Sequence, residues 1–339
     1  MNAPPPPTPS SGTPNDNERR FKAIPLPCEW VEDYRPGGYH PVHLGNVFND
    51  GQYKVIRKLG EGSYSTVWLA HDLEHVALKI LVSEVSESTN ELRILSHISQ
   101  VAPVQAAQQI TQLLAQFEHR GPNGLYKCLV FEPMGPTVNT MVEELPQFKP
   151  RMAKSILRQS LKSLEFLYEH GIAYGNFQPG NMLLALDDIN SKLEYLLQKD
   201  GSKQSELVAP RYLCVGQPLA SLVSHTGDFK IKLSDMGGAY FFTNPPTKPI
   251  TPAGLQAPEL ILTGAVNNTL DVWSFGCLTF ELTTGQPLFC VLWYDLEVKQ
   301  NDDYLLFLTT TLGPLPDELY KHWQTFSLYF TPERKLFNF

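Results

Sequence analysis

The stretch LGEGSYSTVWLA, residues 59–70, decides the fold that we expect. It places Gly60 and Gly62 between two runs rich in branched and aromatic residues, 54–59 and 66–70, and this pattern predicts a β-hairpin. Backbone without a Cβ can approach a phosphate chain closely and point its N–H groups at it. The same glycines also suit an ordinary tight turn, so both interpretations stay open at this point. Because the chain lacks a GxxxxGKS/T motif, the sequence argues against a P-loop nucleotide-binding protein.

The β-rich pattern continues up to residue 132. A third run at 75–81 and a fourth at 126–132 predict strands, and apolar residues at helical spacing predict a helix over 85–98. Lys79 lies among apolar residues of the third run, where an unpaired charge would be costly, and Glu91 on the predicted helix could pair with it. A solvent-facing lysine with an apolar stem is the alternative.

Helical periodicity replaces this pattern in the second half of the chain. Residues 151–170 carry an apolar stripe, which predicts an amphipathic helix. Residues 270–282 are apolar nearly all round, which predicts a helix buried in the centre of its lobe. Each is followed by a glycine, Gly171 and Gly285, at the position that ends a helix. Between them, residues 229–234 alternate apolar and polar side chains, which predicts a half-buried strand.

These patterns divide the chain into consecutive parts. The first residues combine four prolines in a row with Ser, Thr, Asn and charge, a composition that cannot bury enough apolar surface to fold. We expect a disordered Pro-rich extension at 1–27, an ordered arm at 28–52, a small β-rich lobe at 53–135 and a helical lobe at 136–339 that contains a partly ordered insertion at 187–227.

Composition argues against several classes of protein. The 27 Lys and Arg residues against 35 Asp and Glu give a net charge of −8, which argues against direct nucleic-acid binding and mildly favours a basic partner. The five cysteines are dispersed and never form a CxxC pair, so we expect free thiols in a reducing compartment and neither disulfides nor a zinc site. With no leader-like start and no run of about 18 apolar residues, we expect a soluble, intracellular protein without membrane attachment.

Four further motifs follow in order along the second half of the chain. They are NFQPGN at 176–181, SDMGG at 234–238, APEL at 257–260 and DVWSFGC at 271–277. Each alone could be a turn, but independent turns would not fall in this order after a glycine hairpin, a strand lysine and a helix glutamate. Taken together they resemble the signature set of eukaryotic protein kinases.

The lead-in EDYRPGGYHPVHLGNVFNDGQYKVIRKLG at 32–60 and the segment VFEPMG at 130–135 narrow the resemblance. They are similar to the SR-protein kinase group, Ser/Thr kinases that act on Arg/Ser-rich splicing factors, and the chain resembles a divergent member of fungal type. The resemblance covers residue 32 to the C-terminus apart from the insertion, and it is looser after residue 181.

The resemblance implies an α+β, bilobal protein kinase fold with a small β-rich N-lobe and a mainly helical C-lobe. It implies an ATP- and Mg²⁺-dependent enzyme that transfers the γ-phosphoryl group to Ser/Thr hydroxyls of basic Arg/Ser-rich proteins. It further implies a monomer that works in cytoplasm and nucleus in the regulation of mRNA splicing.

Roles for single residues follow from the same resemblance. Lys79 would hold the α- and β-phosphates while paired to Glu91, Asn181 and Asp235 would ligate Mg²⁺, and Asp271 would tie the catalytic loop to the buried helix. The nucleotide would be bound by Leu59, Gly60, Glu61, Gly62, Ser63, Val67, Ala77, Lys79, Glu132 and Met134.

Three positions depart from the family pattern. Asn176 stands where the family has the Asp that accepts the proton of the substrate hydroxyl, and an amide oxygen is a much poorer proton acceptor. Gln178 replaces a Lys near the γ-phosphate, and Gly175 replaces an Arg that pairs with an activation-loop phosphate. Loss of a general base costs about 10²–10⁴ in rate, so we expect a slow kinase. A pseudokinase, an ATP-binding scaffold without efficient transfer, is the alternative.

The C-terminal stretch TPERKLF at 331–337 allows two interpretations. Arg334 could be the late arginine that pairs with Glu259 of the Ala-Pro-Glu motif. We favour the other interpretation, in which Arg334 lies in an upstream loop, the final helices of the large lobe are absent, and Glu259 lacks that partner.

Overall fold

The computed structural model describes residues 28–87, 89–102, 106–144, 149–186, 213–223, 229–292 and 294–337. The predicted extension at 1–27 and most of the predicted insertion lie outside them. The chain divides into two compact units. Unit 1 comprises Met1–Thr89, Ile110–Pro136 and Leu183–Lys230, and unit 2 comprises Asn90–Gln109, Thr137–Met182 and Ile231–Phe339.

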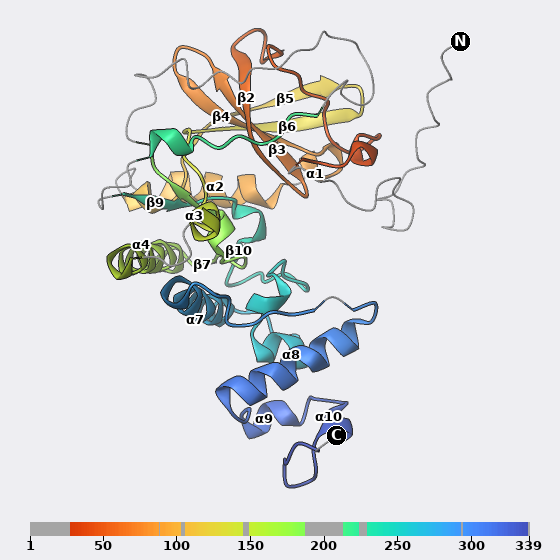
Figure 1. Ribbon diagram of the computed structural model, residues 1–339. Helices are drawn as coiled ribbons and strands as arrows, with labels where there is room; N and C mark the ends of the chain where they lie inside the picture. The colour runs from red at the N-terminus through yellow and green to blue at the C-terminus, as the bar shows by residue number, and fades with distance from the viewer. Residues whose placement is uncertain are drawn as a thin grey trace. The chain divides into compact units, whose positions relative to one another are not determined.

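Unit 1 is built on a six-stranded antiparallel sheet (Figure 1). Its strands in spatial order are β1 (Val47–Phe48), β2 (Tyr53–Gly62), β3 (Ser65–His71), β4 (His75–Leu81), β6 (Gly124–Phe131) and β5 (Leu113–Gly121). One face of the sheet buries the core of the unit, a cluster that includes Trp68, Leu78, Ile80, Tyr126 and Val130. The strands predicted at 54–59, 66–70, 75–81 and 126–132 are confirmed, and β5 is a strand that the sequence did not predict.

The helix predicted over 85–98 is two helices. α1 spans Ser83–Ser86 and α2 spans Asn90–Val101. The break falls in a run of Ser and Thr residues, which favour local side-chain hydrogen bonds over a helix interior. The Ser86 hydroxyl donates to the Val82 carbonyl and accepts from the Lys127 amide of β6, both at 2.9 Å, so it ties α1 to the sheet.

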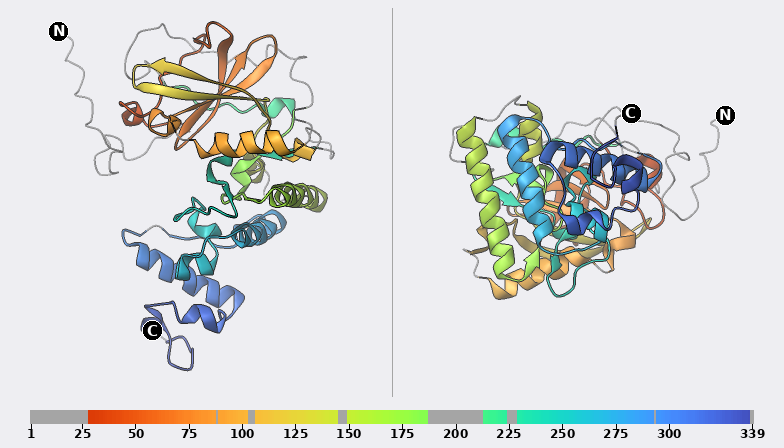
Figure 2. Two further views of the ribbon diagram at one scale, coloured as in Figure 1. Left: turned by 180° about the vertical axis from the view of Figure 1, so that it is seen from behind. Right: turned by 90° about the horizontal axis from the view of Figure 1, so that it is seen from below.

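Unit 2 is mainly helical (Figures 1 and 2). After α2 come α3 (Val138–Glu144), α4 (Pro150–Glu169), α6 (Pro258–Thr263), α7 (Thr269–Thr284), α8 (Glu297–Leu312), α9 (Asp317–Tyr320) and α10 (Phe326–Tyr329). Its short strands are β7 (Ile172–Ala173), β9 (Ile231–Leu233) and β10 (Tyr240–Phe241), and β8 (Met182–Leu184) begins in this unit. β10 pairs antiparallel with β7. Short 3-10 turns occur in both units. Unit 1 has η2 (Val31–Asp33) and η5 (Ala220–Leu222), and unit 2 has η3 (Ala106–Gln109), η4 (Pro179–Asn181), η6 (Met236–Gly238) and η7 (Ala253–Leu255).

The two predicted long helices lie side by side as α4 and α7 (Figure 2). Gly171 and Gly285 follow them with φ of +68° and +77°, the left-handed conformation expected of glycine after a helix. The prediction that 270–282 is buried all round is wrong in part: Val272 is 57% and Phe280 39% exposed. α7 buries one side only, through Leu270, Asp271, Ser274, Cys277, Leu278 and Leu282.

The C-terminal part packs as an aromatic cluster on α7 and α8. Cys277, Phe289, Tyr304, Leu308, Trp323 and Phe330 are among its buried members. Arg334 pairs with Asp317 and lies 4.6 Å from the centre of the Tyr320 ring. Arg334 therefore pairs with Asp317 and not with Glu259, which agrees with this part of the favoured interpretation. Among the helices of the described residues, none is long and apolar enough to cross a bilayer.

Candidate active site

The nucleotide-binding residues predicted on unit 1 lie on one sheet and the segment after it. Leu59, Gly60, Glu61 and Gly62 are on β2, Ser63 is in the turn to β3, Val67 is on β3, Ala77 and Lys79 are on β4, and Glu132 and Met134 follow β6. Val67 is directly opposite Lys79 in the strand register, and Leu69 is opposite Ala77. Since side chains alternate along a strand, all four share the face opposite the core that contains Trp68.

The glycine hairpin has the predicted position but a different role for one residue. β2 and β3 pair up to Gly62 and Ser65, so two residues form the turn. The Glu61 carboxylate turns toward the interior, where it pairs with the Lys58 ammonium at 2.9 Å. Burial raises the pKa of Glu61, and Lys58 counteracts that rise. Only the backbone of Glu61 is then left for a bound phosphate.

The segment after β6 is fixed by hydrogen bonds within unit 1. The Glu132 carboxylate accepts the Gln112 amide at 3.0 Å. The Gly135 amide donates to the Leu184 carbonyl at 2.7 Å, and the Leu184 amide donates to the Pro136 carbonyl at 3.0 Å. The backbone that we expect to bind adenine is thus held on both sides of Met134.

On unit 2, Asp271 holds the loop that contains the NFQPGN motif. Its carboxylate accepts the amides of Tyr174 and Gly175, each at 2.7 Å, and the Tyr168 hydroxyl at 3.4 Å. The carboxylate is buried, and desolvation raises its pKa to about 6 although these three hydrogen bonds lower it. The predicted role of Asp271, tying the loop to the buried helix, is confirmed.

Asn176 and Gln178, two of the departures from the family pattern, contact each other. The side-chain Nε2 of Gln178 donates to Oδ1 of Asn176 at 2.9 Å, and Asn176 is buried. The amide oxygen of Asn176 can accept two hydrogen bonds, and Gln178 takes one of these two positions. This arrangement is a poor one for accepting a proton from a hydroxyl.

The two residues predicted to ligate Mg²⁺ lie close together in the fold. The Asn181 carbonyl accepts both the amide and the hydroxyl of Ser234, at 2.9 and 3.0 Å, and Asp235 is the next residue. The Asn181 side chain donates through Nδ2 to the Asn176 carbonyl at 3.0 Å. Because Nδ2 faces Asn176, the side-chain oxygen Oδ1 of Asn181 faces away from that carbonyl. Asp235 is exposed in a left-handed conformation with φ of +53°. An amide oxygen and a carboxylate are a donor set that fits Mg²⁺.

Glu91 contacts the same region of unit 2. Its buried carboxylate accepts the Met236 amide at 3.3 Å, directly after Asp235. Lys79 is buried on β4 of unit 1, and its pairing with Glu91 stays a prediction.

Sequence reasoning missed Thr251. Its hydroxyl is buried and donates to the Gly175 carbonyl at 2.7 Å, while its own carbonyl accepts from the Gln256 side chain at 3.0 Å. It therefore anchors the segment before the Ala-Pro-Glu motif to the loop with Asn176. A single Thr among prolines has no periodicity, so no pattern signals this contact.

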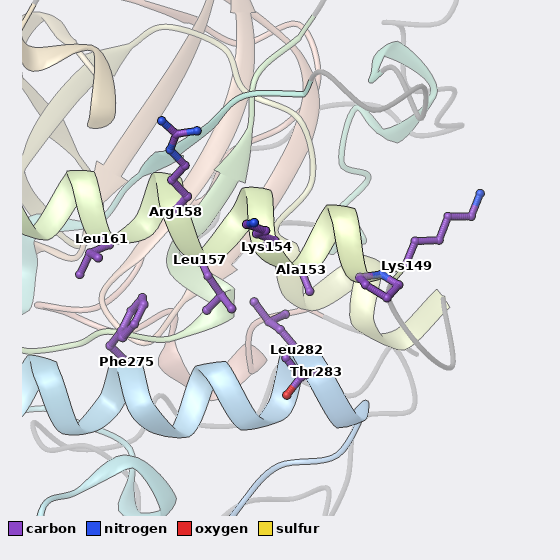
Figure 3. A pocket seen from close by; sticks show the side chains of 10 residues that line it. Lys149, Ala153, Lys154, Leu157, Arg158, Leu161, Phe275, Leu282 and Thr283 are labelled. Atoms are coloured by element: carbon purple, nitrogen blue, oxygen red, sulfur yellow. The ribbon is translucent and has the colours of Figure 1, made fainter.

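A separate hollow of about 750 Å³ lies between α4 and α7 (Figure 3). Leu157 and Leu161 of α4 face Phe275 and Leu282 of α7 across it. None of its lining residues is among the predicted nucleotide-binding or Mg²⁺-binding residues, although Phe275 lies in the DVWSFGC motif.

The comparisons with known proteins agree with the motifs. The family model of the protein kinase domain matches residues 53–207 and 218–331, more than half of the chain. A crystal structure of a kinase domain shares the fold with a TM-score of 0.64 at 23% identity, covering 88% of this chain and 82% of its own. The chain belongs to the protein kinase family and has its α+β fold.

Among its relatives, the serine/threonine-protein kinase SRPK of Physarum polycephalum is 30% identical, over 91% of this chain and 78% of that protein. Protein kinase dsk1 of Schizosaccharomyces pombe is 38% identical over 51% of this chain and 34% of its own length. Human SRSF protein kinase 3 is 36% identical over 46% of this chain and 29% of its own length. Within the family, the chain is a serine/threonine kinase of the SR-protein kinase type. It spans about a third of the length of the last two relatives.

Proposed function

We propose that the protein is an ATP- and Mg²⁺-dependent kinase that phosphorylates Ser/Thr hydroxyls of basic Arg/Ser-rich proteins at a low rate. The observation that supports it best is the pair of hydrogen bonds from Ser234 to the Asn181 carbonyl, because Ser234 directly precedes Asp235, the other predicted Mg²⁺ ligand. The shared face of Val67, Ala77 and Lys79 on unit 1 supports nucleotide binding.

Each unit would contribute a separate part of the chemistry. Unit 1 would bind the adenine through the backbone near Met134 and the phosphates through the glycine hairpin and Lys79. Unit 2 would hold Mg²⁺ through Asn181 and Asp235. The metal would offset the charge of the phosphates, and phosphoryl transfer depends mostly on such positioning and electrostatics.

The low rate follows from Asn176. The residue at this position should orient the substrate hydroxyl and take its proton, but the Asn176 oxygen already accepts a hydrogen bond from Gln178. The same contact favours the second candidate function, a pseudokinase that binds ATP without efficient transfer. Restoring Asp at position 176 should raise the rate about 10²–10⁴-fold, the usual contribution of a general base.

The substrate class rests on relatives and on charge. The human relative is named an SRSF protein kinase, and a net charge of −8 suits a basic protein substrate. We further propose that the protein acts as a monomer in cytoplasm and nucleus in the regulation of mRNA splicing, with ATP and Mg²⁺ as cofactors and without direct nucleic-acid or membrane binding.

The test is phosphate transfer from ATP and Mg²⁺ to an Arg/Ser repeat peptide. Three proteins are compared: the chain as it stands, Asn176→Asp and Lys79→Met. Slow turnover that rises in the Asp variant and disappears in the Met variant supports the slow kinase. Activity in the Asp variant alone supports the pseudokinase, and silence in all three contradicts the proposed phosphate transfer.

A further inference from the structure

Residues 213–223, the last described part of the predicted insertion, lie along β2 of unit 1, where Figure 1 draws them in green; we call them the clasp. The Gln217 amide donates to the Lys58 carbonyl at 2.9 Å. In return, Nε of Arg57 donates to the Gln217 carbonyl at 2.8 Å. Residues 45–48 pair with β2 at Tyr53, Lys54 and Val55, and further along that strand edge the clasp takes up the Lys58 carbonyl.

A buried lysine joins the clasp to the glycine hairpin. Lys58 is fully buried, and its ammonium donates to the Cys214 carbonyl of the clasp at 2.9 Å. The same ammonium pairs with Glu61 between the two hairpin glycines at 2.9 Å, and with Glu29 of the arm. Because a buried ammonium needs all its partners, the clasp and Glu61 are fixed with respect to each other.

The clasp also contacts the hairpin backbone directly. A Cβ built on Gly216 would lie 3.2 Å from the Gly60 Cα and 3.5 Å from the Leu59 carbonyl oxygen. A side chain at position 216 would therefore crowd the first glycine of the hairpin, whose backbone would have to shift by a few tenths of an ångström. A larger residue at position 216 would press on the backbone that is predicted to cover the phosphates.

The apolar end of the clasp reaches the segment after β6, where Glu132 and Met134 are predicted to bind the nucleotide. Leu219 and Leu222 cluster with Leu59 and with the fully buried Leu69. Leu59 itself stays partly exposed, so the clasp forms a wall beside it and leaves part of it open. At its last residue, Val223 packs so close to Gly135 that a Cβ there would lie 2.5 Å from its Cγ2.

We propose that the clasp is a nucleotide-positioning element, which sets the position of the glycine hairpin over the phosphates of a bound adenine nucleotide. This inference rests on the proposed function, since it assigns a role in the same nucleotide site. Gly216 and Gln217 act through the hairpin and do not touch the nucleotide themselves.

The experiment measures the dissociation constants of MgATP and of adenosine by calorimetry for the full chain, Gly216→Val and Ser221→Ala. Ser221 is exposed on the clasp and serves as the matched control. Adenosine lacks the phosphates that the hairpin would cover, so a positioning role affects the two ligands differently. We expect MgATP to bind about tenfold more weakly to Gly216→Val, adenosine to bind within twofold, and Ser221→Ala to match the unchanged chain.

Equal affinities in all three folded proteins, or an equal loss for both ligands in Gly216→Val, would overturn the inference. If Gly216→Val does not fold, hydrogen exchange in the unchanged chain decides. Saturating MgATP should slow exchange of the Gln217 amide at least fivefold because the hairpin and the clasp tighten together, and an unchanged rate contradicts the clasp. Absence of MgATP binding to the unchanged chain overturns the proposed nucleotide site and the clasp role together, which separates that failure from failure of the clasp alone.

Discussion

At the scale of single residues, Gly175 shows that a departure from a family pattern can be a geometric requirement. Its φ is +71°, and a Cβ on it would lie 2.4 Å from the Gly238 carbonyl oxygen and 2.8 Å from the Tyr240 ring. The space that an Arg side chain would need at this position is filled. The sequence alone showed a missing Arg, whereas the structure shows a position where only glycine fits.

The substitution Gly175→Ala should therefore destabilise the fold strongly. We expect a loss of more than about 2 kcal/mol in the free energy of unfolding, since about 1 kcal/mol comes from the left-handed backbone and the rest from overpacking. Gly171→Ala is the matched control because Gly171 also has positive φ but no atom within 4 Å of its Cβ position. Urea unfolding of both variants measures the difference, and equal losses would contradict the steric argument.

Lys58 makes a second prediction at this scale. Its replacement by Met leaves the carboxylates of Glu29 and Glu61 without their buried cation. Breaking a buried pair from one side costs about 3–5 kcal/mol, so we expect that loss in the free energy of unfolding. Lys127→Met removes a partner of Glu118, which is 55% exposed, and should cost less than about 1 kcal/mol. A Lys58 variant as stable as the Lys127 variant would show that the cluster contributes little.

At the scale of elements, the sequence predicted the strands and helices whose apolar residues recur at a fixed period. It missed the segments whose structure depends on contacts with residues far away in the chain. β4, α4 and α7 were predictable because their apolar residues recur at the strand or helix period. β5 was not, since the apolar Leu114 lies on its exposed side and its inward side chains are only half buried. The clasp has no period at all, because its order comes from Arg57 and Lys58, more than 150 residues earlier in the chain.

The same limit applies to the candidate site. Motif order assigned Asn176, Asn181, Asp235 and Asp271 to the helical lobe, and all four lie on unit 2 in segments joined by hydrogen bonds. The contact of Thr251 with Gly175 could not be predicted, because it depends on how a Pro-rich segment folds back.

The link between α7 and the NFQPGN loop predicts a pH dependence of stability. The pKa of Asp271 is raised to about 6 in the fold by burial, above its ordinary value of 3.8. Between about pH 4 and 6 the folded chain therefore binds the proton better than the unfolded chain. The stabilisation from this group is complete below pH 4 and is lost as the pH rises through about 6, by up to about 3 kcal/mol.

Other carboxyls titrate in the same range, so the test compares the unchanged chain with Asp271→Asn. Urea unfolding at several pH values from 4 to 6.5 gives both profiles. The difference between their free energies of unfolding should change across this window, because the variant lacks the titrating group. Parallel profiles would mean that Asp271 has an ordinary pKa.

At the scale of the whole molecule, nucleotide binding and phosphoryl transfer are expected to be separable. The departures Asn176 and Gln178 concern transfer, while the predicted nucleotide-binding residues match the family. MgATP at 100 times its dissociation constant should stabilise the folded chain by about 2.7 kcal/mol, since a ligand that binds only the folded state shifts the unfolding equilibrium. This corresponds to a rise of roughly 5 °C in the midpoint of thermal unfolding.

Two variants turn this shift into a test of the assigned roles. Lys79→Met removes the cation expected on the phosphates, so most of the MgATP shift should be lost. Asn176→Asp changes the group expected to act on the substrate hydroxyl, so its shift should equal that of the unchanged chain even though its transfer rate rises. If Asn176→Asp instead gained a larger MgATP shift together with its rate, the residue would act on nucleotide binding, and the division between a competent nucleotide site and an impaired transfer step would be wrong.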